Sequence, residues 1–152
     1  PMNEIASELN ESILELARSV AKLEKSELHI VHVWNLFGEK ALRGPRFGKN
    51  ETQIKRLLSE TRRAHKEQTE RLLAKADLDE SEYTLHLLKG DPAVIIPKFA
   101  TRHKMDLVVM GTVCRTGLPG FIIGNTAESV LNQVKCSLLT VKPAGFVSPV
   151  EL

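Results

Sequence analysis

Four glycines precede a helical pattern in the part of this sequence that is best suited to bind a ligand. A short apolar run ends at Gly111, a loop follows, and the helical pattern opens at Asn125. Parallel α/β proteins use the order strand, glycine-rich loop and helix to hold a ligand, because backbone N–H groups are free at the start of the helix. Glycine lets the backbone approach an anion without a Cβ atom in the way. The expected contacts to a phosphate chain are Gly111, Thr112, Gly124, Asn125 and Thr126.

Two further side chains of this loop could add chemistry. Arg115 could bring positive charge to a phosphate, and Cys114 beside it could be a reactive thiol. The loop could equally be a plain connection between strand and helix, in which Asn125 and Glu128 form the capping box N-x-x-E. Asparagine can cap a helix and still leave N–H groups free, so both interpretations stay open.

The sequence lacks the common catalytic motifs. It contains no G-x-x-x-x-G-K-[S/T], no G-x-G-x-x-G and no G-x-S-x-G. No paired carboxylates and no histidine lie near the glycine-rich loop, so we assign no general base and no catalytic residue. His29 and His32 lie three residues apart in an expected strand, which turns them to opposite faces and excludes a shared metal.

The composition is that of a globular protein. Of the 152 residues, 42% are hydrophobic and 26% are charged, with a net charge of +2, so nothing calls for a nucleic acid partner. No apolar run approaches the roughly 20 residues that cross a bilayer. No signal peptide is visible, and the two cysteines have neither metal-ligand spacing nor disulfide density, so we expect a cytoplasmic location.

Strands and helices alternate along the chain, which predicts one α/β domain over residues 1–152. Such alternation forms a parallel sheet with helices on both faces. The expected strands are residues 28–34, 83–88, 107–110 and 137–141, and the expected helices are residues 5–25, 51–76, 92–104 and 126–134. Asp91 and Pro92 open the third helix, while Pro97 predicts a kink or a later start near Val94.

Two segments are expected to be irregular. Residues 35–50 hold three glycines and a proline, so no regular element should survive across them. The aromatic and basic side chains of this segment could close as a lid over a phosphate, although a variable surface loop is the favoured interpretation. The tail, residues 143–152, should be extended, either loose or laid on a partner.

At this point the residues resemble the universal stress protein family. Nucleotide-binding members carry G-x-x-G, nine residues and G-[S/T] between the fourth strand and fourth helix, and Gly111 and Gly124 match this spacing. The HVW at residues 32–34 and the GDP at residues 90–92 also fit. GTVCRTG followed by GNTAE, and the tail GFVSPV, look most like tandem-domain members of the universal stress protein E kind.

The resemblance implies a fold with strand order 3-2-1-4-5 and a stress-response function. By it, Val33 and Met110 would contact an adenine base, and the ribose and phosphates would be contacted by Gly111, Gly124, Asn125 and Thr126. The implied ligand is ATP, ADP or AMP, which Mg²⁺ could accompany, bound without rapid catalysis. The alternative is a dimerisation or scaffold domain that binds no nucleotide. An apolar last strand needs a cover, so residues 137–141 are expected to pair with a second copy or a sister domain.

Three departures from the family pattern stand out. Cys114 replaces the second glycine of the motif, and Asn125 replaces the serine or threonine after the last glycine. The family's first strand, which ends in an acidic residue that contacts the nucleotide, is absent from this sequence. Without that strand, two edges would face each other unpaired, at about 1 kcal/mol or more per unsatisfied buried group. We expect that the sequence begins just after this strand or that another chain supplies it. Direct pairing of residues 28–34 with residues 107–110 would contradict this.

Overall fold

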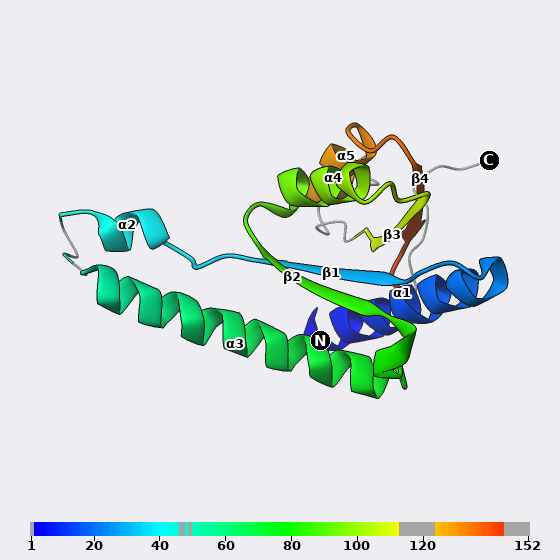
Figure 1. Ribbon diagram of the computed structural model, residues 1–152, viewed down its shortest axis with the longest axis horizontal. Helices are drawn as coiled ribbons and strands as arrows, with labels where there is room; N and C mark the ends of the chain where they lie inside the picture. Colours follow the sequence, from blue (N-terminus) through cyan, green and yellow to red (C-terminus); the bar gives the residue numbers. More distant parts are fainter. Residues whose placement is uncertain (1, 46–47, 49, 113–123, 145–152) are drawn as a thin grey trace.

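The computed structural model describes residues 2–45, 48, 50–112 and 124–144 and confirms the alternation of helices and strands (Figure 1). The elements are α1 (Met2–Glu24), β1 (His29–Trp34), α2 (Glu39–Arg43), α3 (Glu51–Lys75), a 3-10 turn (Glu80–Glu82), β2 (Thr84–Lys89), α4 (Pro92–Arg102), β3 (Leu107–Gly111), α5 (Asn125–Leu131) and β4 (Ser137–Val141). All four expected strands are present, with bounds that differ by one residue at most. The predicted α/β class is therefore confirmed.

The strands form two parallel pairs. β1 pairs with β2 from His29 opposite Thr84, and β3 pairs with β4 from Leu107 opposite Ser137. Among the described residues, no strand joins the two pairs into one sheet. Because β1 does not pair with β3, the expectation of a further strand between them is not contradicted and stays a prediction.

The facing edges of β1 and β3 are incompletely covered. All five residues of β3 are apolar or glycine, yet each is only half-buried, on both faces of the strand. A cavity of about 690 Å³ lies against both strands and is lined by Val31 and His32 of β1 and by Met110 and Gly111 of β3. A second cavity, of about 360 Å³, also touches both strands. An apolar strand between β1 and β3 would cover these side chains and pair both edges, as parallel sheets require.

Helices lie on both sides of the strands. Figure 1 shows α4 and α5 on one side and α1 and α3 on the other. The core between α1, α3 and the first strand pair is built on three buried leucines, with partly buried apolar side chains packed around them. These leucines are Leu14, Leu73 and Leu78, and their neighbours are Leu28, Ile30, Leu72, Ala76, Tyr83 and Leu85. Burial of this apolar stripe, rather than helix propensity, holds long helices in place.

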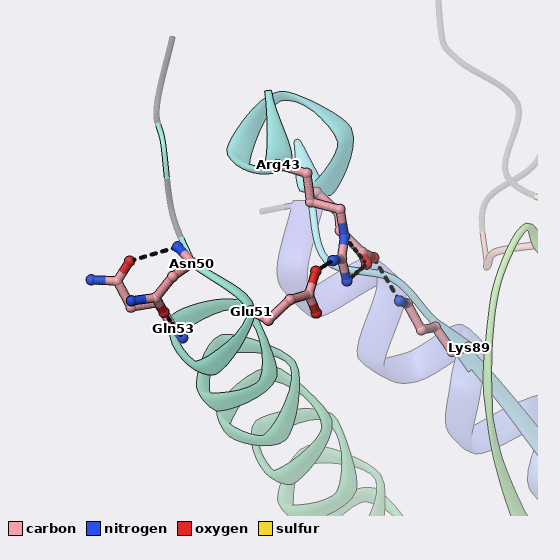
Figure 2. A network of polar contacts seen from close by, with 6 residues as sticks. Arg43, Asn50, Glu51, Gln53 and Lys89 are labelled. Atoms are coloured by element: carbon pink, nitrogen blue, oxygen red, sulfur yellow. Dashed lines mark hydrogen bonds and ion pairs between the residues drawn. The ribbon is translucent and has the colours of Figure 1, made fainter. Parts of the chain in front are cut away.

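The expectation that residues 35–50 contain no regular element is wrong, because α2 forms there. Its five residues, EKALR, include good helix formers, and Arg43 donates to Glu39 one turn earlier. Lys89 at the end of β2 also pairs with Glu39, at 2.6 Å, and Arg43 reaches Glu51 at the start of α3 (Figure 2). A capping box between Asn50 and Gln53 begins α3. These contacts tie α2 to the body of the chain.

α4 begins where the sequence predicts and contains a proline. The Asp91 side chain accepts a hydrogen bond from the Ala93 N–H at 2.9 Å, and Pro92 occupies the first turn. The alternative start near Val94 is therefore wrong, and the helix ends at Arg102. Pro97 cannot donate to the Ala93 carbonyl four residues earlier. The side-chain amide of Gln133 donates to this carbonyl instead, at 3.2 Å, and so connects α4 to the segment after α5.

Candidate functional site

The end of β3 places Met110 and Gly111 at the wall of the larger cavity. A Cβ atom added to Gly111 would lie 2.9 Å from Ile13 Cδ1 and 2.9 Å from Leu9 Cδ2, both on α1. These distances are shorter than ordinary carbon contacts, which begin near 3.5 Å. A side chain at Gly111 would therefore force Ile13 and Leu9 of α1 to shift.

Thr112 follows directly and is committed to the fold. The residue is 2% exposed. Its backbone N–H donates to the Val141 carbonyl of β4 at 2.9 Å, and its hydroxyl lies 3.5 Å from the same oxygen. Because this N–H is already bonded, it is not available to a phosphate. Among the expected phosphate contacts, Thr112 thus has its backbone N–H bonded to β4.

The start of α5 differs from the predicted capping box. Gly124 is the N-cap, with extended backbone angles (φ −71°, ψ 153°), and its carbonyl accepts from the Glu128 N–H at 2.9 Å. Asn125 is the first helical residue, and it does not cap the helix. The prediction of Asn125 as the cap, with Glu128 in a capping box, is therefore wrong. α5 also begins one residue earlier than expected and ends at Leu131 instead of residue 134. Asn125 is exposed and Thr126 is half-buried.

Val33 lies on β1 beside the one tryptophan of the chain. Alternation along a strand turns Val33 to the opposite face from His32 and Trp34. Trp34 is 6% exposed, and its indole N–H finds no acceptor among the described residues. A buried donor without a partner usually costs about 1–3 kcal/mol, so such groups merit an explanation. Sequence reasoning missed Trp34, whose position at the carboxyl end of a strand was the available signal.

Two expected site residues lie outside the described part of the chain. Cys114 and Arg115 belong to residues 113–123, and the tail beyond residue 144 also lies outside it. The remaining expected phosphate-loop residues fall into two groups. Met110, Gly111 and Thr112 lie at the end of β3, and Gly124, Asn125 and Thr126 lie at the start of α5.

The charged side chains around the larger cavity are already paired. Lys75 lines it and bonds to Glu11 of α1, while Arg71 lines it and contacts Glu67 on its own helix. Burial, followed by the nearby His65, lowers the pKa of His32 at the same wall. Among the described residues, no group of three or more His, Cys, Asp or Glu is arranged to hold a metal ion.

The cavity has the dimensions of a small-molecule site. Such pockets usually measure about 300–1,000 Å³ and combine apolar walls with a few polar groups. At about 690 Å³ the cavity falls in this range, with Met110 and Ile30 as apolar wall and the side chains of Ser7, Asn10 and Gln68 as polar groups. This cavity also occupies the gap between β1 and β3, where a further strand is expected, and residues 124–126 do not line it. No carboxylate among the lining residues stands ready to act as a base.

The family is decided by comparison over nearly the whole chain. A profile of the universal stress protein family matches residues 5–142. The chain belongs to this family. The resemblance read from the glycine spacing, HVW and GDP is therefore confirmed.

Individual relatives agree with this assignment. Universal stress protein E of Salmonella typhi is 45% identical over 71 residues, which cover 47% of this chain and 22% of that protein. Protein PA1789 of Pseudomonas aeruginosa PAO1 has a solved structure that matches with a TM-score of 0.59 and 31% identity, over 86% of this chain and 39% of that one. The chain thus spans less than half the length of these two relatives.

A further solved structure shares the fold and contains a ligand. It is a universal stress protein in complex with cAMP, with a TM-score of 0.53, 18% identity and coverage of 91% of this chain and 87% of that one. At this identity the likeness shows the fold alone. In the described part of the chain, the helices are too short or too polar for any of them to cross a lipid bilayer.

Proposed function

We propose that this chain is one universal stress protein domain that binds an adenine nucleotide, or a similar anion, at residues 111–126 in a stress response. The observation that carries the proposal is the cAMP complex of a protein with the same fold. Family membership over residues 5–142 adds support, since the glycine spacing of the nucleotide-binding motif falls inside the matched region.

The proposed contacts follow the strand ends. Val33 and Met110 would contact the base, because both are apolar and lie near the carboxyl ends of β1 and β3. The ribose and phosphates would be held by the backbone at Gly111, Gly124, Asn125 and Thr126, with Thr112 close by. Cys114 and Arg115 would complete the loop. Ligands of open α/β sheets bind beyond the carboxyl ends of the strands, which is where these residues lie.

The proposed role is binding without rapid chemistry. General acid–base catalysis needs a titratable group within hydrogen-bond reach of the reacting atoms. Asp106 and Glu128 are the nearest carboxylates in sequence among the described residues, and both are exposed. ATP, ADP and AMP are the proposed ligands, and Mg²⁺ would accompany the polyphosphates.

Mass spectrometry of the purified and then denatured protein tests the proposal by detecting co-purified nucleotide. A thermal-shift titration with ATP, ADP and AMP follows, because a ligand at a hundred times its Kd should add about 2.7 kcal/mol of stability. The double variant Cys114→Gly and Asn125→Ser restores the family motif and should strengthen binding. Asn132→Ser, at a position that is also exposed and lies at the other end of α5, is the matched control and should leave binding unchanged.

A second candidate function is a dimerisation or scaffold domain, favoured by the two residues that the fold itself uses. Gly111 is closely packed against Ile13 and Leu9 of α1, and the Thr112 N–H is bonded to β4. β4 has a strand on one side only among the described residues, and its half-buried Leu138 and Leu139 suit pairing with a second copy or a sister domain. Absence of nucleotide, with no thermal shift at millimolar ligand and a dimer in sedimentation analysis, would favour this function.

A further inference from the structure

All five histidines of the chain are gathered in two clusters, one on each face of β1. The first cluster joins His29 of β1, His86 of β2 and His103, which follows α4. His29 Nδ1 lies 3.0 Å from His86 Nε2, so one imidazole donates to the other. The ring of Phe99 on α4 packs against both His86 and His103, with its centroid 4.6 Å from that of His86 and 4.1 Å from that of His103.

The second cluster lies on the opposite face of β1. His32 Nε2 is 2.9 Å from His65 Nδ1 of α3, again at hydrogen-bond distance. The ring of Trp34 stands 6.2 Å from that of His65. Both helices therefore contact the strands through an imidazole ring: α3 through His65 on His32, and α4 through Phe99 on His86.

We propose that the two clusters form a pH-sensitive joint, in which protonation of the histidines loosens α3 and α4 from β1 and β2 as the solution becomes acidic. A hydrogen bond between two imidazoles needs one unprotonated nitrogen as acceptor. When both rings carry a proton, both nitrogens are donors and two positive charges stand about 3 Å apart. In the second cluster, the contact that joins α3 to β1 in neutral solution then becomes repulsive. In the first cluster, the charges of His29 and His86 repel His103 at the end of α4, whose ring centroid lies 6.1 Å and 5.8 Å from theirs.

The electrostatic environment sets the direction of the effect. Burial, followed by the charges of His29 and His103, lowers the pKa of His86. Burial, followed by His65, lowers the pKa of His32. The unfolded chain therefore binds more protons than the folded chain just below pH 6.5, and stability falls with falling pH in this range.

Few carboxylates face the first cluster to compensate the added charge. Glu27 Oε2 lies 3.4 Å from His29 Nε2, but the Glu27 side chain is 92% exposed, so water screens this pair. Asp106 and Lys104 line the cavity that His29 and His103 also line, and they carry opposite charges. α1 contributes only apolar side chains to that cavity.

The second cluster faces cations more than acids. The cavity beside His32 is lined by Arg71 and Lys75 of α3, and their acidic partners, Glu67 and Glu11, do not line it. The side chains from α1 in this lining are uncharged, as are those from β3. Protonated imidazoles therefore gain no buried counter-ion in either cluster.

The test measures denaturant unfolding of the whole chain at pH 7.5 and 5.5. For each histidine that takes up its proton only on unfolding, the unfolding equilibrium constant rises up to about tenfold for every pH unit by which the pH falls below 6.5. For His32 and His86 together, the rise is up to about a hundredfold per pH unit. His86→Gln should remove up to tenfold of this dependence per unit, and His32→Gln the same. Glu82→Gln is the control, because this carboxylate stays ionised over the range and its loss should change stability equally at both pH values.

Two readouts on the parent protein keep the test decisive if a variant does not fold. Histidine ring NMR signals should show at least two residues that titrate below pH 6.5. Amide exchange at pH 5.5 should lose protection first in α4 and around His65 in α3, before β3 and β4. The proposal is overturned if all five rings titrate at or above pH 6.5, or if His86→Gln and His32→Gln keep the pH dependence of the parent.

Discussion

Gly111 offers a direct test of how α1 packs on β3. In Gly111→Ala, the new Cβ atom would lie 2.9 Å from both Ile13 Cδ1 and Leu9 Cδ2, so two side chains must move by roughly half an ångström or more. Leu9 is buried and cannot move away freely. Overpacking of this kind costs about 1–3 kcal/mol, and alanine regains about 0.4–1 kcal/mol by restricting the unfolded chain. A net loss of about 0.5–2 kcal/mol is expected.

The assay is urea unfolding without added ligand, supported by Tm, which should fall about 2–4 °C per kcal/mol for a chain of this size. Ile13→Val removes the Cδ1 atom and costs about 0.5–1.5 kcal/mol alone. In the double variant, part of the Gly111→Ala cost should vanish, because one of the two close contacts no longer exists. Strictly additive costs, or a stabilised Gly111→Ala protein, would refute the packing explanation and leave ligand approach as the reason for this glycine.

Three further predictions concern other parts of the fold. Gln133→Ala should destabilise the chain by about 0.5–1.5 kcal/mol in urea unfolding, because the Ala93 carbonyl loses its donor in a helix where Pro97 supplies none. Lys22 and Arg18 lower the pKa of Glu82 to about 2. The stability that these two ion pairs contribute should therefore be complete above pH 4.5 and be lost as the pH falls from 4.5 to 2. In Glu82→Gln, the free energy of unfolding should depend less on pH over this range. If a further strand pairs with both β1 and β3, the backbone amides of β1 and β3 that point into the gap between them should exchange slowly. Fast exchange of these amides in both strands would contradict the presence of such a strand.

The strands were predictable because their signal is local. Runs of apolar and β-branched residues, such as the one ending at Trp34, report burial in a parallel sheet wherever they occur. The start of α4 was predictable for the same reason, since Asp91 and Pro92 are cap and first-turn residues in sequence order. The family motif around Gly111 also rests on spacing along the chain alone.

The failures arise where neighbouring residues compete or where distant segments meet. The pattern N-x-x-E at Asn125 fits a capping box, but Gly124 is the N-cap. Asn125 is therefore the first helical residue, where its side chain cannot act as the cap. α2 forms inside a glycine-rich segment, where Glu39 pairs both with Arg43 one turn later and with Lys89, 50 positions later in the chain. The sequence around His32 gives no signal that predicts its contact with His65. These contacts exist only after α3 has packed on β1.

The candidate site separates into residues that the fold needs and residues that it leaves free. Gly111 packs closely on Ile13 and Leu9 of α1, and the Thr112 N–H is bonded to β4, so substitutions at either residue should lower stability and any nucleotide affinity together. Asn125 is exposed and does not cap its helix, so Asn125→Ser should change affinity with little change in stability. The two functions proposed for the chain therefore diverge at Asn125. A binding domain must respond to this substitution, whereas a scaffold that dimerises through β4 has no reason to.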